Sequence, residues 1–234
     1  MKVLATCNQK GGVGKTTTAR NLARAAIQQG RRTLVVDLDP QGNLTSVLSV
    51  EEMPDDVAGV ADALSDRSGD TLLDVIVPTI WEGLDLAPTV GDLLESVRDE
   101  LVTAGAGRES RLRRALVAVS DRYDLVIIDC RPALDQLTIN GLTAADVAVI
   151  VTNPDLFSAN GIAQLRRTIE AVREHYNPDL QVGGVIINHH EQASTIQSRH
   201  WTAEIREAGL RGGWLRRPRR RPRPCRPSPY AGTV

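Results

Sequence analysis

A glycine-rich loop with two lysines constrains the fold of this 234-residue chain more than any other feature. The segment CNQKGGVGKTTT (7–18) follows the apolar stretch VLAT and leads into the alanine-rich stretch TTTARNLARAAIQQG (16–30). Glycines allow backbone N–H groups to turn toward a phosphate, and a lysine and a hydroxyl beside them complete such a site. The order of strand, glycine loop and helix therefore predicts a phosphate-binding loop.

The choice of cation in this loop supports the same interpretation. Only Lys2, Lys10 and Lys15 are lysines among 28 cationic residues, and two of the three lie in the loop. Random placement would give lysine at both loop positions about once in a hundred cases, whereas a compact ammonium fits a ring of backbone amides better than a planar guanidinium does. A phosphate site is therefore favoured over a structural glycine turn after a strand.

Apolar runs alternate with amphipathic stretches along the whole chain. Further strands are predicted in 31–43, 83–89, 123–130, 146–153 and 180–189, and helices in 108–121, 134–146, 156–176 and 193–210, with shorter helical pieces in 57–65 and 71–77. This alternation predicts an α/β fold, a single domain with a mostly parallel sheet covered by helices on both faces. Ligands bind such sheets at the carboxyl ends of the strands, where acidic or glycine-rich turns fall here.

Composition points to a soluble protein of the reducing cytosol. The chain has no run of about 18 uncharged apolar residues and no signal-peptide stretch at its N-terminus. Cys7, Cys130 and Cys225 are odd in number and widely spaced, which argues against a disulfide framework. We therefore expect a cytoplasmic location.

Three motifs resemble those of one ATPase family. The loop departs from the common pattern GxxxxGK[ST], because Gln9 stands five positions before Gly14. Its variant KGGVGKT resembles the deviant Walker A motif of the ParA/MinD superfamily. VVDLDPQGN resembles the second phosphate-side motif of the ParA branch, and DLVIIDCRPAL its Walker B strand and switch. The resemblance covers residues 1–210 and implies a P-loop NTPase fold of the SIMIBI type.

The resemblance implies that the loop binds ATP. It assigns Lys15 to the β and γ phosphates, and Thr17 and the loop amides to phosphate oxygens. Asn188 ends a strand where relatives contact adenine, although a turn residue is the alternative there. The complete implied set is Lys10, Gly11, Gly12, Val13, Gly14, Lys15, Thr16, Thr17 and Asn188.

The same resemblance implies a Mg2+ ion beside the phosphates. Thr16 is the implied direct ligand, Asp37 lies near the metal shell, and Asp129 acts on the metal through water. Asp39 is the implied water-positioning residue for hydrolysis, which depends on positioning and charge stabilisation. Taken singly, the three acids could also be ordinary residues at strand ends.

Lys10 is the signature lysine of the superfamily, where it reaches across a dimer to the partner's nucleotide. Two charges about 4 Å apart interact by roughly 4 kcal/mol at an effective dielectric near 20. Two nucleotides face to face would repel each other unless each met a cation from the opposite subunit. The resemblance therefore implies an ATP-dependent homodimer in which Lys10, Lys15 and Asp39 act in catalysis.

Other potential ligands have structural interpretations. Cys130 invites comparison with related iron proteins that bridge an iron-sulfur cluster, but those need two cysteines per subunit, so a small buried residue is favoured. His189, His190 and His200 lack a carboxylate or cysteine at ligand spacing, so a solvated loop is favoured over a metal site. Arg131 replaces the usual proline of the switch, which predicts a flexible cation near the γ-phosphate.

Residues 211–234 differ from the rest of the chain. They hold eight arginines and no acid, whereas residues 1–210 hold 20 cations and 29 acids, a net charge of -9. Their proline and arginine content predicts disorder. One explanation is a basic arm that binds DNA phosphates; the favoured one is a frameshifted terminus, because arginine, proline and glycine dominate out-of-frame reading of GC-rich genes.

The combined features predict a ParA-type ATPase of plasmid or chromosome partition. It would dimerise with ATP, bind DNA non-specifically, associate with the nucleoid and be stimulated by a ParB-type partner. Because the chain starts at its first strand, we expect no N-terminal helix-turn-helix domain. A MinD-like ATPase at a membrane is the alternative, but it needs a C-terminal amphipathic helix that GGWLRRPRRR does not provide. A non-hydrolysing regulatory P-loop protein is the third interpretation.

Overall fold

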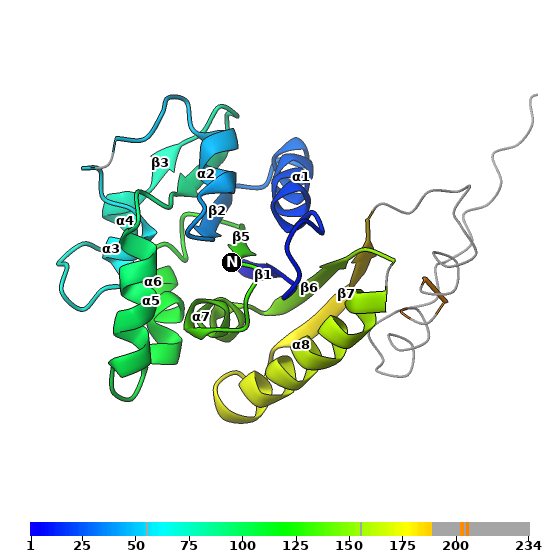
Figure 1. The fold of residues 1–234 in the computed structure, drawn as a ribbon. Helices are drawn as coiled ribbons and strands as arrows, with labels where there is room; N and C mark the ends of the chain where they lie inside the picture. The colour runs from blue at the N-terminus through cyan, green and yellow to red at the C-terminus, as the bar shows by residue number, and fades with distance from the viewer. Residues whose placement is uncertain (55, 155, 189–201, 204, 206–234) are drawn as a thin grey trace, which may run out of the picture.

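The computed structural model describes residues 1–54, 56–154, 156–188, 202, 203 and 205, and its centre is one seven-stranded sheet (Figure 1). The strands are β1 (Lys2–Cys7), β2 (Thr33–Leu38), β3 (Val77–Pro78), β4 (Leu84–Ala87), β5 (Leu125–Cys130), β6 (Val147–Thr152) and β7 (Gln181–Ile187). Their order in the sheet is β3-β4-β2-β5-β1-β6-β7, and every neighbouring pair is parallel except β3 with β4. The predicted α/β fold with a mostly parallel sheet is confirmed.

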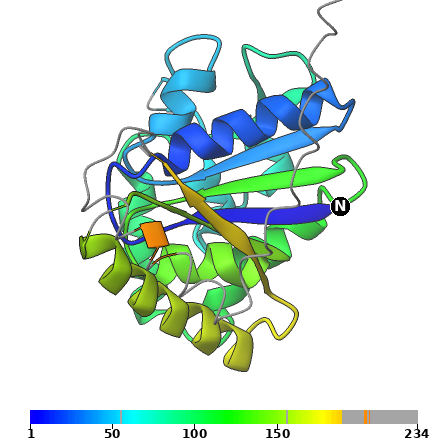
Figure 2. The same ribbon diagram turned by 90° about the vertical axis from the view of Figure 1, so that its right-hand side faces the viewer.

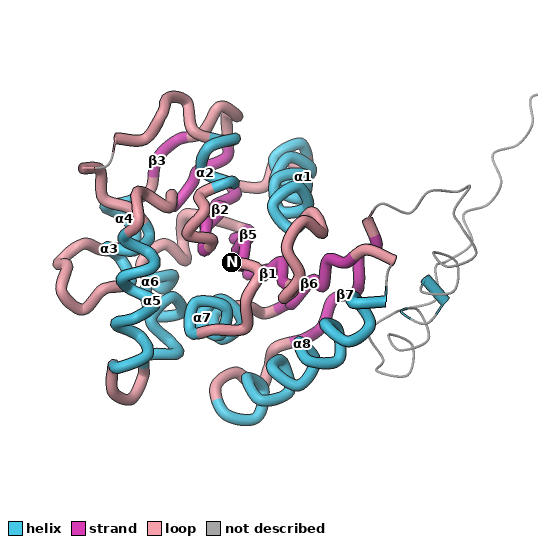
Figure 3. The backbone as a smooth tube through the Cα atoms, in the orientation of Figure 1, coloured by secondary structure: helices cyan, strands magenta, loops and turns pink. Residues whose placement is uncertain are grey.

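Helices cover both faces of this sheet (Figures 2 and 3). One face carries α1 (Lys15–Gln28) and α2 (Asn43–Leu48). The other face carries α3 (Val60–Leu64), α4 (Leu72–Val75), α5 (Leu93–Thr103), α6 (Arg111–Val117), α7 (Gln136–Ala144) and α8 (Leu156–His175). Within the described part of the chain, no helix has the length and apolar character needed to cross a membrane.

The buried strands explain why the sequence folds in this way. All six residues of β2 are buried, including Thr33 and Asp37, and five of the six residues of β5 are buried. Strands covered by helices on both faces need apolar residues on both sides, which is why these segments show no alternation. On the α1 side, Ala19 and Ala23 allow the helix to approach the sheet closely.

The helix α1 ends where the glycine in its sequence predicts. Gly30 has a φ of 73°, a left-handed conformation that glycine adopts without strain. The N–H of Gly30 donates to the carbonyl of Ile27, and the N–H of Arg31 donates to that of Ala26. These bonds satisfy carbonyl groups that the end of a helix leaves open.

Several elements differ from the sequence prediction. The helices α2 and α5 and the strand β3 are additional, and the predicted helix in 108–121 is a short 3-10 turn, Arg108–Ser110, followed by α6. The stretch 71–77 divides into α4 and the start of β3 because Val77 and Pro78 pair antiparallel with β4. The predicted helix in 193–210 and the tail 211–234 lie almost entirely outside the described residues.

The helix α7 packs closely on the sheet through a glycine. A Cβ atom at Gly141 would lie 2.9 Å from the Sγ of Cys130 and 3.4 Å from side-chain carbons of Ile128 and Leu38. Cys130 is a free and buried thiol, as predicted. The glycine therefore sets the distance between α7 and the strand that carries Asp129.

We expect Gly141→Ala to lower the free energy of unfolding by about 1 kcal/mol, measured by urea denaturation. Overpacking a core costs about 1–3 kcal/mol, which exceeds the gain of up to about 1 kcal/mol from replacing glycine in a helix. In a Cys130→Ala background the sulfur is gone, so the same substitution should be neutral or stabilising. An equal loss in both backgrounds would contradict the proposed contact.

Candidate functional site

The glycine loop connects β1 to α1 at the carboxyl end of the sheet, as predicted. Gly12 and Gly14 have φ values of 69° and 89°, and Gly14 is the N-cap of α1. A Cβ atom at Gly14 would lie 2.5 Å from the Nδ2 of Asn188, which donates a 2.8 Å hydrogen bond to the carbonyl of Val13. Gly14 is therefore required both by its conformation and by its close contact with the end of β7.

Asn8 holds the beginning of the loop, a role that the sequence analysis missed. Its side chain is buried, and its Nδ2 donates a 2.7 Å hydrogen bond to the carbonyl of Val151 in β6. Its Oδ1 accepts a hydrogen bond from the N–H of Lys10 at 3.1 Å. The available signal was an asparagine directly after an apolar strand, because a buried side-chain amide needs hydrogen-bond partners.

Lys15 is buried at the first position of α1. Its Nζ donates a 3.0 Å hydrogen bond to the carbonyl of Lys10 and so closes the loop on itself. Burial lowers the pKa of this ammonium, while the carboxylates of Asp129 and Asp39 oppose that effect. The side chain thus lies inside the loop, on the same side as two carboxylates.

Asp129 brings Thr16 and the central strands together. Its Oδ1 accepts a 3.1 Å hydrogen bond from the hydroxyl of Thr6. The hydroxyl of Thr16 lies close enough to act on the pKa of the same carboxylate. Its Oδ2 is buried and has no hydrogen-bond partner in the described residues. Burial raises the pKa of Asp129 to about 6, against the effect of these two hydroxyls and of Lys15.

The unpartnered Oδ2 atom fits the role predicted for Asp129 beside a hydrated Mg2+. Magnesium keeps several water ligands and uses few protein ligands, so a carboxylate that accepts from a metal-bound water suits it. Among the residues that the structure describes, no three His, Cys, Asp or Glu side chains form a group that could hold a metal ion. This donor set suits a magnesium ion bound mainly by phosphate and water.

Asp37 differs from Asp129 in that hydrogen bonds from the protein occupy both of its carboxylate oxygens. Its Oδ2 accepts 2.8 Å hydrogen bonds from both the N–H and the hydroxyl of Thr45, and its Oδ1 accepts from the N–H of Asp39. Burial, and then the charge of Asp129, raise the pKa of Asp37 to about 7. In this arrangement Asp37 positions the loop between β2 and α2, and its contact with a metal shell stays a prediction.

Asp39 lies at the end of β2, close to the loop. Its Oδ1 accepts a 3.1 Å hydrogen bond from the N–H of Gln41, and its carbonyl accepts from the N–H of Gly42. The side chain is buried, and its charge acts on Lys15. The structure therefore brings Asp39, Asp129 and Lys15 together, as the sequence analysis expects.

Arg131 is not the flexible cation that the sequence analysis predicted. Its guanidinium pairs with Glu95 of α5 and with Asp135, the N-cap of α7, each at 3.1 Å. Only 17% of its side chain is exposed. Two carboxylates thus fix Arg131, because a buried guanidinium requires such partners.

Most of the remaining predicted residues lie on the outer side of the loop, whereas Val13 is buried. Gly11, Gly12 and Thr17 are exposed, and Lys10 is partly exposed. These positions are accessible to a nucleotide or to a second molecule. His189, His190 and His200 lie outside the described residues, so the solvated loop predicted for them stays a prediction.

Comparisons with known proteins point to one family. A family model described as an AAA domain matches residues 1–182. The sporulation initiation inhibitor protein Soj of Bacillus subtilis is 45% identical over 186 residues, 80% of this chain and 72% of that protein. The chromosome partitioning protein ParA of Myxococcus xanthus is 41% identical over 197 residues, 83% of this chain and 67% of that protein.

The chain spans less of some relatives. An uncharacterised protein of Mycobacterium tuberculosis is 41% identical over 206 residues, which cover 88% of this chain and 63% of that protein. A large part of that relative thus has no counterpart in the aligned residues.

Two similar solved structures contain a nucleotide. The structure described as cobyrinic acid a,c-diamide synthase from Mycobacterium smegmatis, with an ATP analogue and magnesium, has a TM-score of 0.80 and 38% identity, and the match covers 88% of this chain and 82% of that chain. A complex of a Cyanothece McdA variant with ATP has a TM-score of 0.81 and 25% identity, over 90% of this chain and 80% of that chain. Both proteins share the sheet and helix arrangement described above.

The two buried carboxylates predict how stability depends on pH. The pKa values of Asp37 and Asp129 rise from 3.8 to about 7 and about 6, so the folded state holds protons that the unfolded state has already released. We therefore expect the free energy of unfolding of the nucleotide-free and magnesium-free protein to fall between about pH 4 and pH 7, by up to about 1.4 kcal/mol per pH unit for each proton. Urea denaturation at several pH values measures this slope.

The variant Asp129→Asn is the control for this slope. It removes one of the two titrating groups, so its stability should depend less on pH between about pH 4 and pH 6. Asp124, whose pKa is lowered to about 2 by Arg32, changes stability only at lower pH. Stability that rises between pH 5 and pH 7 in the unmodified chain would contradict the assignment.

Proposed function

We propose that this chain, which belongs to the ParA/Soj family of P-loop ATPases, hydrolyses ATP with Mg2+ as cofactor and acts in DNA partition. The observation that carries the proposal is the grouping of Lys15, Thr16, Asp129 and Asp39 beneath the two-lysine loop. A buried ammonium inside a glycine loop, next to a hydroxyl and a partly unsatisfied carboxylate, has the chemistry required by a magnesium nucleotide.

The loop would bind the phosphates through groups such as the Lys15 ammonium, which is hydrogen-bonded within the loop in this structure. Lys15 would exchange the carbonyl of Lys10 for phosphate oxygens, which are stronger acceptors because they are charged. The hydroxyl of Thr16 would hold the Mg2+ ion directly, and the carboxylate of Asp129 would hold it through water. When bound, Mg2+ neutralises charge that develops on the phosphate oxygens.

Asp39 would position the attacking water. Its carboxylate is held by the N–H of Gln41, and its backbone N–H donates to Asp37. The hydrogen bonds from Thr45 to Asp37 fix this segment against α2. A small movement of the segment would therefore change the position of the Asp39 carboxylate and with it the rate of hydrolysis.

Lys10 would make the active unit a homodimer. Its backbone is fixed by Asn8 and Lys15, while its side chain lies at the outer part of the loop. We propose that this ammonium binds the nucleotide of a partner subunit. The dimer would then form only when ATP is bound, and hydrolysis would need the dimer. Such a cation is needed because the negatively charged triphosphates of two facing nucleotides would otherwise repel each other.

The proposed cellular role follows from the family. The ATP-bound dimer would bind DNA non-specifically in the cytoplasm, associate with the nucleoid and release it after a ParB-type centromere-binding protein stimulates hydrolysis. Stable membrane association is not part of this proposal. The domain limits proposed from the sequence, 1–210 for the ATPase domain and 211–234 for a basic tail, belong to the same hypothesis.

ATP turnover with and without duplex DNA tests the proposed function, with no other substrate added. We expect Mg2+-dependent hydrolysis that DNA increases, and ATP-dependent DNA binding that weakens steeply with salt because phosphate contacts release counterions. ATP-dependent binding to liposomes instead of DNA would favour the MinD-like alternative. Absence of hydrolysis under all conditions would favour a non-hydrolysing regulatory protein.

The two loop lysines should have separable effects. We expect Lys10→Ala to keep nucleotide binding, because the Lys10 group that Lys15 contacts is the backbone carbonyl, which the substitution retains. The variant should lose ATP-dependent dimerisation and hydrolysis. Lys15→Ala should weaken ATP binding by about tenfold or more, because it removes the buried cation from the phosphate site. Light scattering and nucleotide titration measure these effects. Lys2→Ala is the matched control, because Lys2 is a surface lysine whose ammonium pairs with Asp146 at 3.3 Å. Normal ATP-dependent dimers of the Lys10 variant would overturn the assignment.

A further inference from the structure

Two arginines of α1 stack on the indole ring of Trp81 at the surface of the molecule. The guanidinium carbon atoms of Arg20 and Arg24 each lie 4.9 Å from the centroid of this ring, so they are no more than twice that distance apart. The two arginines are spaced i, i+4 along the helix and therefore lie on one face of it. Arg24 is exposed, and Arg20 and Trp81 are half-buried. The stack thus concentrates two positive charges beside one aromatic side chain.

Neither guanidinium is neutralised by the chain itself. Of the carboxylates that the structure describes, none pairs with Arg20 or Arg24. The Nε atom of Arg20 is buried and has no hydrogen-bond partner among the same residues. By contrast, Arg131 in the loop after β5 is held by two carboxylates. A guanidinium that has lost water without gaining an acceptor favours an anion from outside the chain.

Apolar side chains border this stack. Trp81 packs against buried residues of α1, α2 and the sheet, among them Ala23 and Leu48. Ile80 is 50% exposed, and its N–H donates to the carbonyl of Leu48 at the end of α2. Val47 of α2 is 45% exposed. Tryptophan and arginine often dominate the energy of protein interfaces, so a cationic and apolar surface of this kind is typical of a site that binds another protein.

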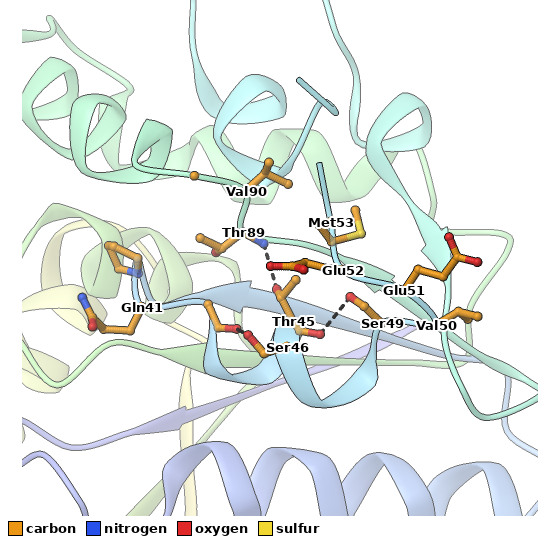
Figure 4. Close-up of a pocket in the computed structure, with 13 residues that line it drawn as sticks. Gln41, Thr45, Ser46, Ser49, Val50, Glu51, Glu52, Met53, Thr89 and Val90 are labelled. Carbon is orange, nitrogen blue, oxygen red and sulfur yellow. Dashed lines mark hydrogen bonds between the residues drawn. The ribbon is translucent and has the colours of Figure 1, made fainter. Parts of the chain in front are cut away.

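The surrounding charge limits what this surface can bind. Residues 33–97, which include Trp81, hold 14 acidic residues and a single cation, Arg67. The nearby cavity beside α2 is lined by Glu51 and Glu52 and by no described cation (Figure 4), so an anion would be repelled there. Duplex DNA carries one negative charge per about 1.7 Å over a broad surface, and these acids oppose its approach to this part of the molecule. A peptide segment with a few carboxylates is narrow enough to meet the two arginines alone.

We propose that the surface formed by Arg20, Arg24, Ile80 and Trp81 binds an acidic peptide segment of a protein partner. Carboxylates of that segment accept hydrogen bonds from the two guanidiniums, whose planar groups can each donate two parallel bonds while they stay stacked on the ring. Aliphatic side chains of the segment pack on Ile80 and on the exposed part of Trp81. This binding does not rest on the proposed ATPase activity, because the surface uses none of the residues assigned to ATP or Mg2+.

Nuclear magnetic resonance of the 234-residue protein tests this proposal, with the indole N–H signals of its three tryptophans as local reporters. Trp81 reports on the proposed surface, and Trp214 reports on the arginine-rich residues 211–234, which also attract anions. The variants Trp81→Phe and Trp214→Phe assign the two signals. The probe is an octa-glutamate peptide, and octa-glutamine, of nearly equal shape but without charge, is the control ligand. We expect octa-glutamate to shift the Trp81 signal to saturation and octa-glutamine to leave it unchanged.

Two double variants locate the binding. Arg20→Gln/Arg24→Gln should raise the dissociation constant measured at Trp81 about tenfold, since two ion pairs beside an aromatic ring are lost. Glutamine is a good helix former, so α1 should stay folded. The matched control Arg113→Gln/Arg114→Gln removes the same charge from exposed positions of α6, on the other face of the sheet, and should change the constant less than about twofold.

The comparison of these signals decides the proposal. Equal weakening in both double variants would show attraction by net charge in general and would overturn the surface as the site. A shift confined to Trp214 would place the peptide on residues 211–234 alone and would also overturn it. Duplex DNA is the competing ligand: if DNA shifts the Trp81 signal at lower concentration than octa-glutamate, and Arg20→Gln/Arg24→Gln abolishes that shift, the surface binds nucleic acid and the proposal is wrong. ATP is absent throughout, so failure of the proposed ATPase function would not change these results.

Discussion

The burial of the Lys15 ammonium is the interaction on which the rest of the site depends. A charge removed from water is tolerated only when nearby groups replace its hydration. Here the carbonyl of Lys10 and the carboxylates of Asp129 and Asp39 do so. The strand order makes this possible. The strands β2, β5 and β1 are neighbours, so the loop and both carboxylates lie together at the carboxyl ends of these strands.

This arrangement lowers the stability of the folded protein when no ligand is bound. Asp37 and Asp129 lie at paired positions of β2 and β5, and both have raised pKa values, so the site concentrates negative charge in a buried place. A bound cation would relieve that repulsion, and the free energy gained would appear as affinity. Destabilisation of an empty site in favour of function is common in enzymes.

The sequence predicts those strands, helices and loops whose structure is determined by residues close together in the chain. The apolar runs of β2 and β5 and the glycine loop are recognisable because each depends on neighbouring residues. The helix α5 was also predictable, since Leu94, Val97 and Leu101 follow helical spacing and are buried. Arg131 could not be placed from sequence, because its fixation depends on Glu95, which lies 36 residues away in the chain. The contacts of Asn8 and Asn188 with the loop region likewise depend on the completed sheet.

The hydrogen bond between Asn188 and Val13 joins groups 175 residues apart in the chain. During synthesis β1 leaves the ribosome before its sheet neighbours β5 and β6, which follow more than a hundred residues later. Domains fold as the necessary segments emerge, at about 5–20 residues per second. The nucleotide loop is therefore made long before the strands that fix its shape, so a nascent chain would gain its ATP site only after β7 and Asn188 have emerged.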